Sequence, residues 1–116
     1  MDPDFDEFLH VPARLAILAL LAPADRVDFG FLRDTVETSD SALSKQISVL
    51  ADAGYVTVEK SRSQGVRRTR VALTQAGRRA FRRHAAALER IAALAHQPEA
   101  PGAGAVPSRK GRRGGR

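Results

Sequence analysis

Side chains that could contact a nucleic acid gather in two groups between residues 39 and 70. The first group carries hydroxyl, amide or ammonium groups and consists of Ser39, Ser41, Ser44, Lys45, Gln46 and Ser48. Glutamine can make a bidentate contact to adenine, lysine can reach guanine or a phosphate, and serine can serve either role. The second group consists of Lys60, Arg62, Arg67, Arg68 and Arg70, with Gln64 among them. Such cations neutralise phosphates, and an arginine can also enter a narrow minor groove.

Charge is segregated along the chain. Residues 1–59 carry four basic and eleven acidic residues, a net charge of −7, whereas residues 60–96 carry ten basic and one acidic residue, a net charge of +9. Residues 97–116 add +4, which gives the whole chain +6. This segregation indicates a surface that faces a polyanion. The alternatives are a polar helix face that is merely solvated and a basic tail that only aids solubility. Five cations within residues 60–70, with no acid among them, favour contact with DNA.

The sequence offers little for other kinds of chemistry. It has no cysteine, which excludes disulfides, thiolate metal sites and thiol catalysis. No nucleophile lies at a helpful spacing from a base, and no glycine loop could cradle a phosphate. His10, His84 and His96 are scattered, and His84 is expected to be a solvated residue on a basic helix face. We therefore expect no enzymatic activity, no metal and no cofactor.

The sequence predicts a cytoplasmic protein, associated with the nucleoid and not with a membrane. Its longest apolar run, Leu15 to Ala22, is far too short to span a bilayer. The first residues, MDPDFDEF, are acidic, unlike a signal peptide.

Three helices are predicted ahead of the basic group. The first begins at Pro12, ends near Pro23 and carries the apolar residues Leu15, Ile17, Leu18 and Leu21. A short second helix has Asp28 as its expected N-cap, and its inner side carries Phe29, Leu32 and Val36. After a polar turn that supplies a cap from Thr38, Ser39 or Asp40, a third helix carries the core stripe Leu43, Ile47, Leu50 and Ala51. Gly54 is a typical helix stop. The second and third helices together are expected to form a helix-turn-helix, with the polar side of the third in the major groove.

A β-hairpin and a long helix are predicted to follow. Val56 and Val58 alternate with polar residues, Ser61 to Arg68 form the expected turn, and Val71 and Leu73 alternate on the return strand. Thr74 is the expected cap of a closing helix over residues 75–95. That helix carries an apolar line of Phe81, Leu88, Ile91 and Leu94.

The closing helix is predicted to mediate dimerisation. Twenty residues span about 30 Å, which is more than a domain of this size can cover. Ile91 and Leu94 therefore have no obvious partner within one chain, and we expect them to meet a second subunit, with Phe5, Phe8 and Leu9 contributing. The alternative is that the apolar line packs back on its own domain.

The chain divides into three predicted regions. Residues 1–10 form an arm, residues 11–96 form the DNA-binding domain with its dimerisation helix at 75–95, and residues 97–116 form a disordered basic tail. The tail ends in SRKGRRGGR, for which we expect non-specific electrostatic affinity; an inert solubilising tail is the alternative.

Residues 10–81 resemble the small winged-helix transcriptional regulators of the MarR/ArsR neighbourhood, closest to MarR-like ones. The matching stretches are HVPARLAILALLA, VDFGFLRDTVETSDSALSKQISVLADAGYV and VEKSRSQGVRRTRVALTQAGRRAF. The resemblance implies an α+β, mostly α fold: a three-helix core, a two-stranded β-wing and a C-terminal dimerisation helix. It also implies a homodimer, usually a repressor, whose recognition helices read a palindromic site in double-stranded DNA.

The chain departs from the wider families in two respects. Metal-sensing relatives use cysteine or clustered histidines and acids, which are missing here. Larger relatives wall an effector pocket with additional helices, whereas only one helix follows the wing in this chain, so we expect no deep effector pocket. The sequence does not identify a small-molecule effector. A winged-helix module that binds protein or RNA instead of duplex DNA is the alternative function.

Overall fold

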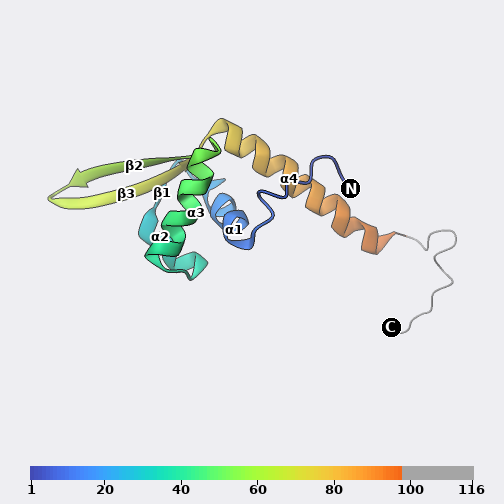
Figure 1. Ribbon diagram of the computed structural model, residues 1–116, viewed down its shortest axis with the longest axis horizontal. Coiled ribbons are helices and arrows are strands. Elements are labelled where there is room, and N and C mark those ends of the chain that lie inside the picture. Colours follow the sequence, from blue (N-terminus) through green and yellow to red (C-terminus); the bar gives the residue numbers. More distant parts are fainter. Residues whose placement is uncertain (98–116) are drawn as a thin grey trace.

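The computed structural model describes residues 1–97. Within them, four α-helices, a short 3₁₀-helix and three strands follow one another as an α+β winged helix, which confirms the predicted fold class (Figure 1). Their bounds are α1 (Pro12–Leu21), β1 (Val27–Asp28), α2 (Phe29–Val36), α3 (Asp40–Asp52), β2 (Val56–Ser63), β3 (Val66–Leu73), α4 (Gln75–Ala93) and η1 (Leu94–His96). Within this range, every helix is too short or too polar to span a lipid bilayer. The predicted disordered tail lies outside the described residues, apart from Gln97.

The sheet has three strands instead of the two that the sequence predicts. β3 lies in the middle and pairs antiparallel with β2 on one side and with β1 on the other. β1 contributes only Val27, opposite Val71, and Asp28, opposite Arg70. A strand of two residues is too short to show any alternation of polar and apolar residues, which is why the sequence did not reveal it.

The β2–β3 hairpin (residues 56–73), here called the wing, is longer than predicted. Ser61 to Arg68 were expected to form its turn, but the strands continue to Ser63 and resume at Val66. The turn is therefore only Gln64 and Gly65, whose φ angles of 52° and 77° fit the type I′ turn that joins twisted strands tightly. The outer strand residues are all exposed, so no buried face marks them as strand in the sequence.

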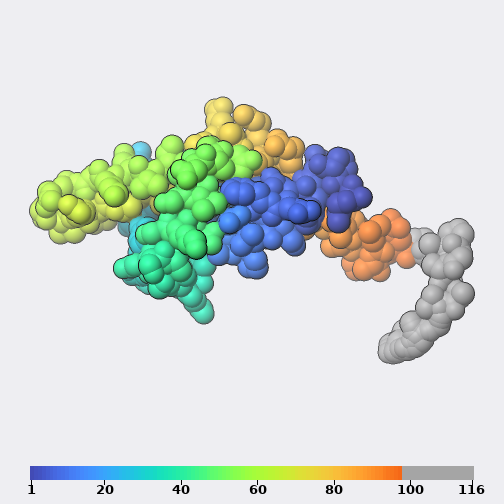
Figure 2. Space-filling view, in the orientation of Figure 1, coloured from blue at the N-terminus to red at the C-terminus, as the bar shows by residue number. Residues whose placement is uncertain are grey.

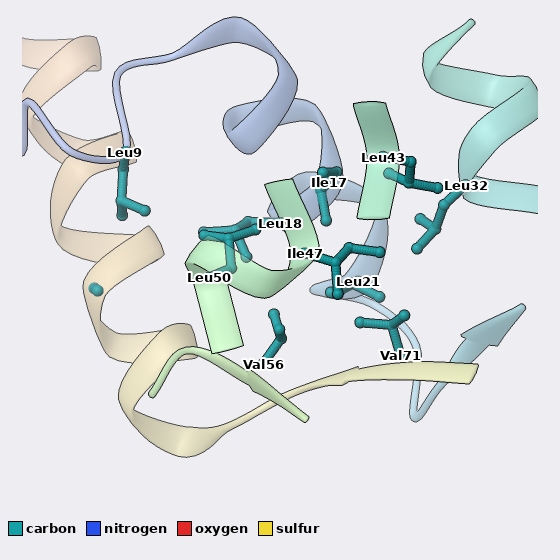
Figure 3. Close-up of a cluster of buried hydrophobic side chains, with 11 residues drawn as sticks. Leu9, Ile17, Leu18, Leu21, Leu32, Leu43, Ile47, Leu50, Val56 and Val71 are labelled. Carbon is teal, nitrogen blue, oxygen red and sulfur yellow. The ribbon is translucent and has the colours of Figure 1, made fainter. Parts of the chain in front are cut away.

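The hydrophobic core lies where the three helices of the helix-turn-helix region meet the base of the sheet (Figure 3). Its side chains, each at most 4% exposed, are Leu9, Ile17, Leu18, Leu21, Leu32, Leu43, Ile47, Leu50, Val56, Val71 and Ala80. The predicted stripe of α3 is confirmed, with Ala51 partly buried at its margin. Leu9 belongs to the arm (residues 1–10), so the arm is packed against the core and is not only a loose leader.

Side-chain caps begin two helices as predicted, and a third expected cap is missing. Ser39 Oγ accepts the backbone N–H of Ala42 at 3.1 Å, and Thr74 Oγ1 accepts that of Gly77 at 2.9 Å. Asp28 precedes α2, but its carboxylate makes no capping hydrogen bond. It faces Arg70 instead, with Oδ1 3.2 Å from the arginine Nε.

The junction before α4 joins three elements closely. Thr74 Oγ1 donates to the carbonyl of Gly54 at 2.7 Å, and the Thr74 N–H donates to the carbonyl of Tyr55 at 3.0 Å. Gly54 ends the α3 region with a φ of 84°, as predicted. Gly77 packs so tightly on the same loop that a Cβ there would overlap the Tyr55 carbonyl oxygen.

The face of α4 that packs inwards differs from its predicted apolar line. Its buried residues are Gly77, Ala80, His84 and Ala87. Leu88 and Ile91 are only half-buried, and Leu94, in η1, is 61% exposed. The prediction that His84 is solvated is wrong: its side chain is completely buried, because the arm crosses α4 above it.

Candidate nucleic-acid interface

The outer face of α3 presents short polar side chains to solvent. Ser41, Ser44, Lys45 and Ser48 are all exposed, as expected of residues available to a nucleic acid. Ser39 lies at the same end of the helix, where its hydroxyl is engaged as the N-cap and lies 3.4 Å from that of Ser41. α3 therefore offers hydroxyls and one ammonium group on a surface with no large apolar side chain.

The one acidic group at the start of α3 is paired with an arginine. Asp40 Oδ1 accepts a hydrogen bond of 2.9 Å from Arg33, which also contacts Asp34 at 2.9 Å. These two carboxylates raise the pKa of Arg33 above its ordinary value, so the guanidinium stays charged. This pairing reduces the repulsion between Asp40 and a phosphate.

Gln46 is placed differently from the other polar residues of α3. It is half-buried, and its Oε1 accepts a hydrogen bond of 2.9 Å from Arg14 Nε in α1. Arg14 also donates to the carbonyl of Phe8 at 2.8 Å and lies over the Phe8 ring, 4.6 Å from its centroid. The amide of Gln46, which was predicted to contact DNA, thus also ties α3 to α1 and the arm.

The wing divides its cations between its two faces. Residues directly opposite in an antiparallel pair share a face, and the pairs Lys60–Thr69 and Arg62–Arg67 alternate with Ser61–Arg68 and Glu59–Arg70. The first two pairs lie on the face that also carries the buried Val71, next to α3. The other two lie on the opposite face.

The cations of the two wing faces have different partners. On the face away from α3, Asp28 lies 3.2 Å from Arg70 and 3.6 Å from Arg68. On the face towards α3, Lys60, Arg62 and Arg67 have no carboxylate within 4.0 Å among residues 1–97. Within the described part of the chain, Arg62 donates to the carbonyl of Gly65 at 3.5 Å. The α3 side of the wing therefore carries three cations without a carboxylate partner, whereas Arg68 and Arg70 on the other side share the carboxylate of Asp28. Gln64 sits at the tip in the turn.

A hollow of about 360 Å³ lies between α3 and the wing. α3 contributes Asp40, Ser44 and Ser48 to its rim, and the wing contributes Lys60 and Thr69. Its apolar floor consists of Phe29, Ile47, Val58 and Val71. Figure 2 shows α3, in green, and the wing, in yellow-green, side by side on one face of the molecule. Two groups of polar residues that are separate in the sequence thus border one open depression.

The basic residues of α4 also differ in their exposure and in their hydrogen-bond partners. Arg79, Arg82 and Arg83 are exposed, whereas Arg78 donates to the carbonyl of Ala22 at 2.6 Å. Arg90 is bound by Asp2, at 2.6 and 2.9 Å, and by Asp4, at 3.1 Å. Hydrogen bonds from this guanidinium lower the pKa of Asp2 from 3.8 to about 2. The first half of α4 therefore adds exposed positive charge, whereas Arg90 in its second half is paired with the acidic arm.

His10 and His84 form a pair that was not predicted, because the three histidines are scattered in the sequence. His84 Nε2 lies 3.3 Å from His10 Nδ1, although no group of three or more potential metal ligands occurs among residues 1–97. Burial, followed by the proximity of His10, lowers the pKa of His84 below its ordinary value. The spacing of Gly77, Ala80, His84 and Ala87 on α4 was the available signal, since small residues at helical intervals mark a closely packed face.

Comparisons with known proteins agree with this geometry. A family model described as winged helix DNA-binding domain matches residues 13–92. An uncharacterized protein of Methanocaldococcus jannaschii is 31% identical over 71 residues, which cover 61% of this chain and 77% of that protein. A transcriptional regulator homologue from Pyrococcus horikoshii OT3 superimposes with a TM-score of 0.74 at 24% identity, covering 79% of this chain and 91% of its own. A MarR family transcriptional regulator from Silicibacter pomeroyi gives a TM-score of 0.62 at 24% identity, covering 76% and 58%.

Proposed function

This chain belongs to the winged helix DNA-binding domain family, and from that premise we propose that it is a sequence-specific, double-stranded DNA-binding regulator of transcription, acting as a homodimeric repressor. Its fold is that of transcriptional regulators and not of enzymes. The observation that carries the proposal is the common surface of α3 and the wing, where the exposed hydroxyls of Ser44 and Ser48 share one hollow with Lys60. The same face of the wing continues outward to Arg62 and Arg67, which like Lys60 lack a carboxylate partner within residues 1–97.

We propose that α3 enters the major groove and reads base edges. The groove admits one α-helix, and hydroxyl and ammonium groups match its donors and acceptors. Ser41, Ser44, Lys45 and Ser48 supply these groups from the exposed side of α3. Gln46 acts by holding α3 against α1 through Arg14, and Ser39 acts mainly as the cap.

The wing follows the phosphate backbone and reaches the adjoining minor groove. Lys60, Arg62 and Arg67 lie on the α3 side and are the cations for this contact, with Gln64 at the tip. Arg68 and Arg70 contribute less to DNA affinity because both face Asp28. Their contribution is to hold the base of the wing against β1.

The dimer is supported by the apolar side chains that α4 and η1 leave uncovered. Leu88 and Ile91 are half-buried, and Leu94 is 61% exposed. Covering them with the same residues of a second chain would bury apolar area and place two α3 helices in one assembly. A two-fold assembly of this kind reads a palindromic operator, and its occupation of that operator blocks transcription.

Selection of bound duplexes from a random pool, combined with the mass of the protein and of the complex in solution, tests the function. We expect a palindromic consensus whose half-sites are about one helical turn apart, bound by two chains. A pool of structured RNA and a pool of non-palindromic duplex serve as controls. Enrichment of RNA alone, or no enrichment of any duplex, would favour the module that binds RNA or protein.

A further inference from the structure

The arm is fastened to α4 at two points that DNA binding does not explain. At its beginning, Arg90 holds Asp2 and Asp4. Further along, the backbone N–H of Asp6 donates to Nδ1 of the buried His84 at 2.9 Å. Figures 1 and 2 show the arm, in dark blue, against α4. The arm is therefore a strap across α4, with one ionic and one histidine fastening.

The histidine fastening requires neutral imidazoles. His84 Nδ1 accepts the N–H of Asp6, so the ring proton of neutral His84 must sit on Nε2. That Nε2–H then donates to His10 Nδ1, 3.3 Å away. A proton added to His84 would place its Nδ1–H against the Asp6 N–H. A proton added to His10 would place its Nδ1–H against the Nε2–H of His84. Phe5 closes the cluster, with its ring centroid 4.9 Å from that of His84.

We propose that the arm and α4 form an acid-released latch: protonation of the His84–His10 pair detaches the arm from His84 and thereby lowers the affinity of α3 for DNA. The inference rests on the proposed function for its second half only. Histidine is the side chain whose charge changes most readily near neutral pH, and paired or buried histidines serve as pH sensors elsewhere.

The charged surroundings of His84 are consistent with a neutral resting state. Burial, followed by the proximity of His10 in the arm, lowers the pKa of His84, and the Asp6 carboxylate opposes them. α1 also packs against α4, but its single charged side chain, Arg14, is directed to Gln46 and the Phe8 carbonyl. On α4 itself, Arg90 is occupied by Asp2 and Asp4.

The ionic fastening keeps the arm attached when the histidine fastening opens. Because Arg90 lowers the pKa of Asp2 to about 2, that carboxylate remains charged in the range where histidines titrate. Acid therefore opens the strap near His84 while its first residues stay on Arg90. The change is local and reversible, unlike acid unfolding of the whole domain.

A continuous set of contacts connects the latch to α3. The arm continues from Asp6 to Phe8, whose carbonyl accepts from Arg14 at 2.8 Å. Arg14 in turn donates to Gln46 of α3 at 2.9 Å. Displacement of the arm removes the Phe8 carbonyl and ring from Arg14, and the guanidinium that positions α3 then loses two of its partners. This is the route by which a proton at His84 weakens binding of DNA.

Nuclear magnetic resonance of the full-length, ¹⁵N-labelled protein, together with duplex affinity at constant ionic strength, tests the latch. At pH 7.5 we expect the Nε2–H tautomer of His84 and a hydrogen-bonded Asp6 amide. Between pH 7.5 and 5 the amides of residues 5–10 should shift together with His84. Affinity for the selected duplex should fall on the same curve, by at most about tenfold per pH unit for one linked proton.

Variants separate the latch from general effects of acid. His84→Gln should abolish the pH dependence of DNA affinity between pH 7.5 and 5.5, because an amide can accept the Asp6 N–H without titrating. His96→Gln is the matched control and should behave like the wild type. If His84→Gln fails to fold, Arg90→Gln provides a second test, since loss of the ionic fastening should move arm release to higher pH.

The outcomes are distinct. Amides of residues 5–10 that stay unmoved while His84 takes up a proton would overturn the latch. A pH dependence of DNA affinity that is equal in wild type and His84→Gln would overturn its coupling to α3. Movement of the arm with His84 in a protein that binds no duplex at any pH would support the latch and reject the proposed function.

Discussion

Arginines of the wing differ in their expected contribution to DNA affinity, although they look alike in the sequence. Arg67 and Arg70 are both wing arginines, three residues apart. Arg67 pairs across the strands with Arg62 on the side of α3, whereas Arg70 faces Asp28 on the other side. The electrostatic contribution of each therefore depends on the face to which the strand turns it.

Arg67→Ala should weaken binding to all duplexes alike and reduce the slope of log affinity against log salt by about one, as for the loss of one phosphate contact. Arg70→Ala is the matched control, and its effect on the slope should be much smaller. Affinities are measured from 50 to 200 mM salt. Equal slopes for the two variants would contradict the assignment of faces.

Lys45→Ala should instead change which bases are preferred. Lys45 is exposed on the outer side of α3, and loss of a specific base contact costs about 1–3 kcal/mol at that base pair. Its neighbour Gln46 is the comparison: Gln46→Ala removes the Arg14 contact and should weaken binding without altering the consensus. Duplex selection with each variant checks this, and an altered consensus for Gln46→Ala alone would reverse the two roles.

At the scale of elements, the approach of α4 to the loop after α3 fixes the base of the wing. Gly77→Ala would place a methyl group on the Tyr55 carbonyl oxygen, and overpacking of this kind destabilises by about 1–3 kcal/mol. Urea unfolding measures the loss. Gly30→Ala, in α2, is the control, since its Cβ would meet only Arg33 at 3.5 Å and helix propensity favours alanine by about 0.5–1 kcal/mol. A Gly77→Ala protein as stable as wild type would show that the loop at Tyr55 can move to accommodate the methyl group without loss of stability.

α4 also carries the proposed subunit contact. Ile91→Asp should yield a monomer, because a carboxylate cannot be buried in an apolar interface without a partner. Ala93→Asp introduces the same charge at an exposed position and should leave the dimer intact. Light scattering gives the mass of each. If Ile91→Asp and Leu88→Asp both keep the mass of the wild type, the interface lies elsewhere.

At the scale of the whole molecule, acid should reduce the free energy of unfolding in two separate steps. The pKa of His84 is lowered from its ordinary 6.5 in the folded state, so its contribution is complete above that pH and declines as the pH falls below it. The pKa of Asp2 is lowered from 3.8 to about 2, so its contribution is complete above 3.8 and declines as the pH falls towards 2.

Urea unfolding as a function of pH resolves the two steps. His84→Gln should remove the decrease in the free energy of unfolding below pH 6.5, and Asp2→Asn should remove only the decrease below pH 3.8. A wild-type stability that does not decline between pH 6.5 and 5 would show that His84 tolerates a proton in the folded state.

The sequence by itself determined the order of the main elements, the core stripe of α3, two helix caps and the segregation of positive charge. These features are encoded locally, in side-chain periodicity over one or two turns and in residues with strong positional preferences. The resemblance to winged-helix regulators rested on residues 10–81, which hold both the polar helix and the basic hairpin.

Only the tertiary structure decided which of these residues lie together. It placed Arg68 and Arg70 on Asp28, turned Gln46 to Arg14, and buried His84 under the arm, whose Asp6 lies 78 residues earlier in the chain. Each depends on a contact between segments distant in the chain, and no local pattern specifies such a partner. The polar surface could be predicted from the sequence because its residue types are local, whereas its division into DNA-facing and structural residues is a property of the folded chain.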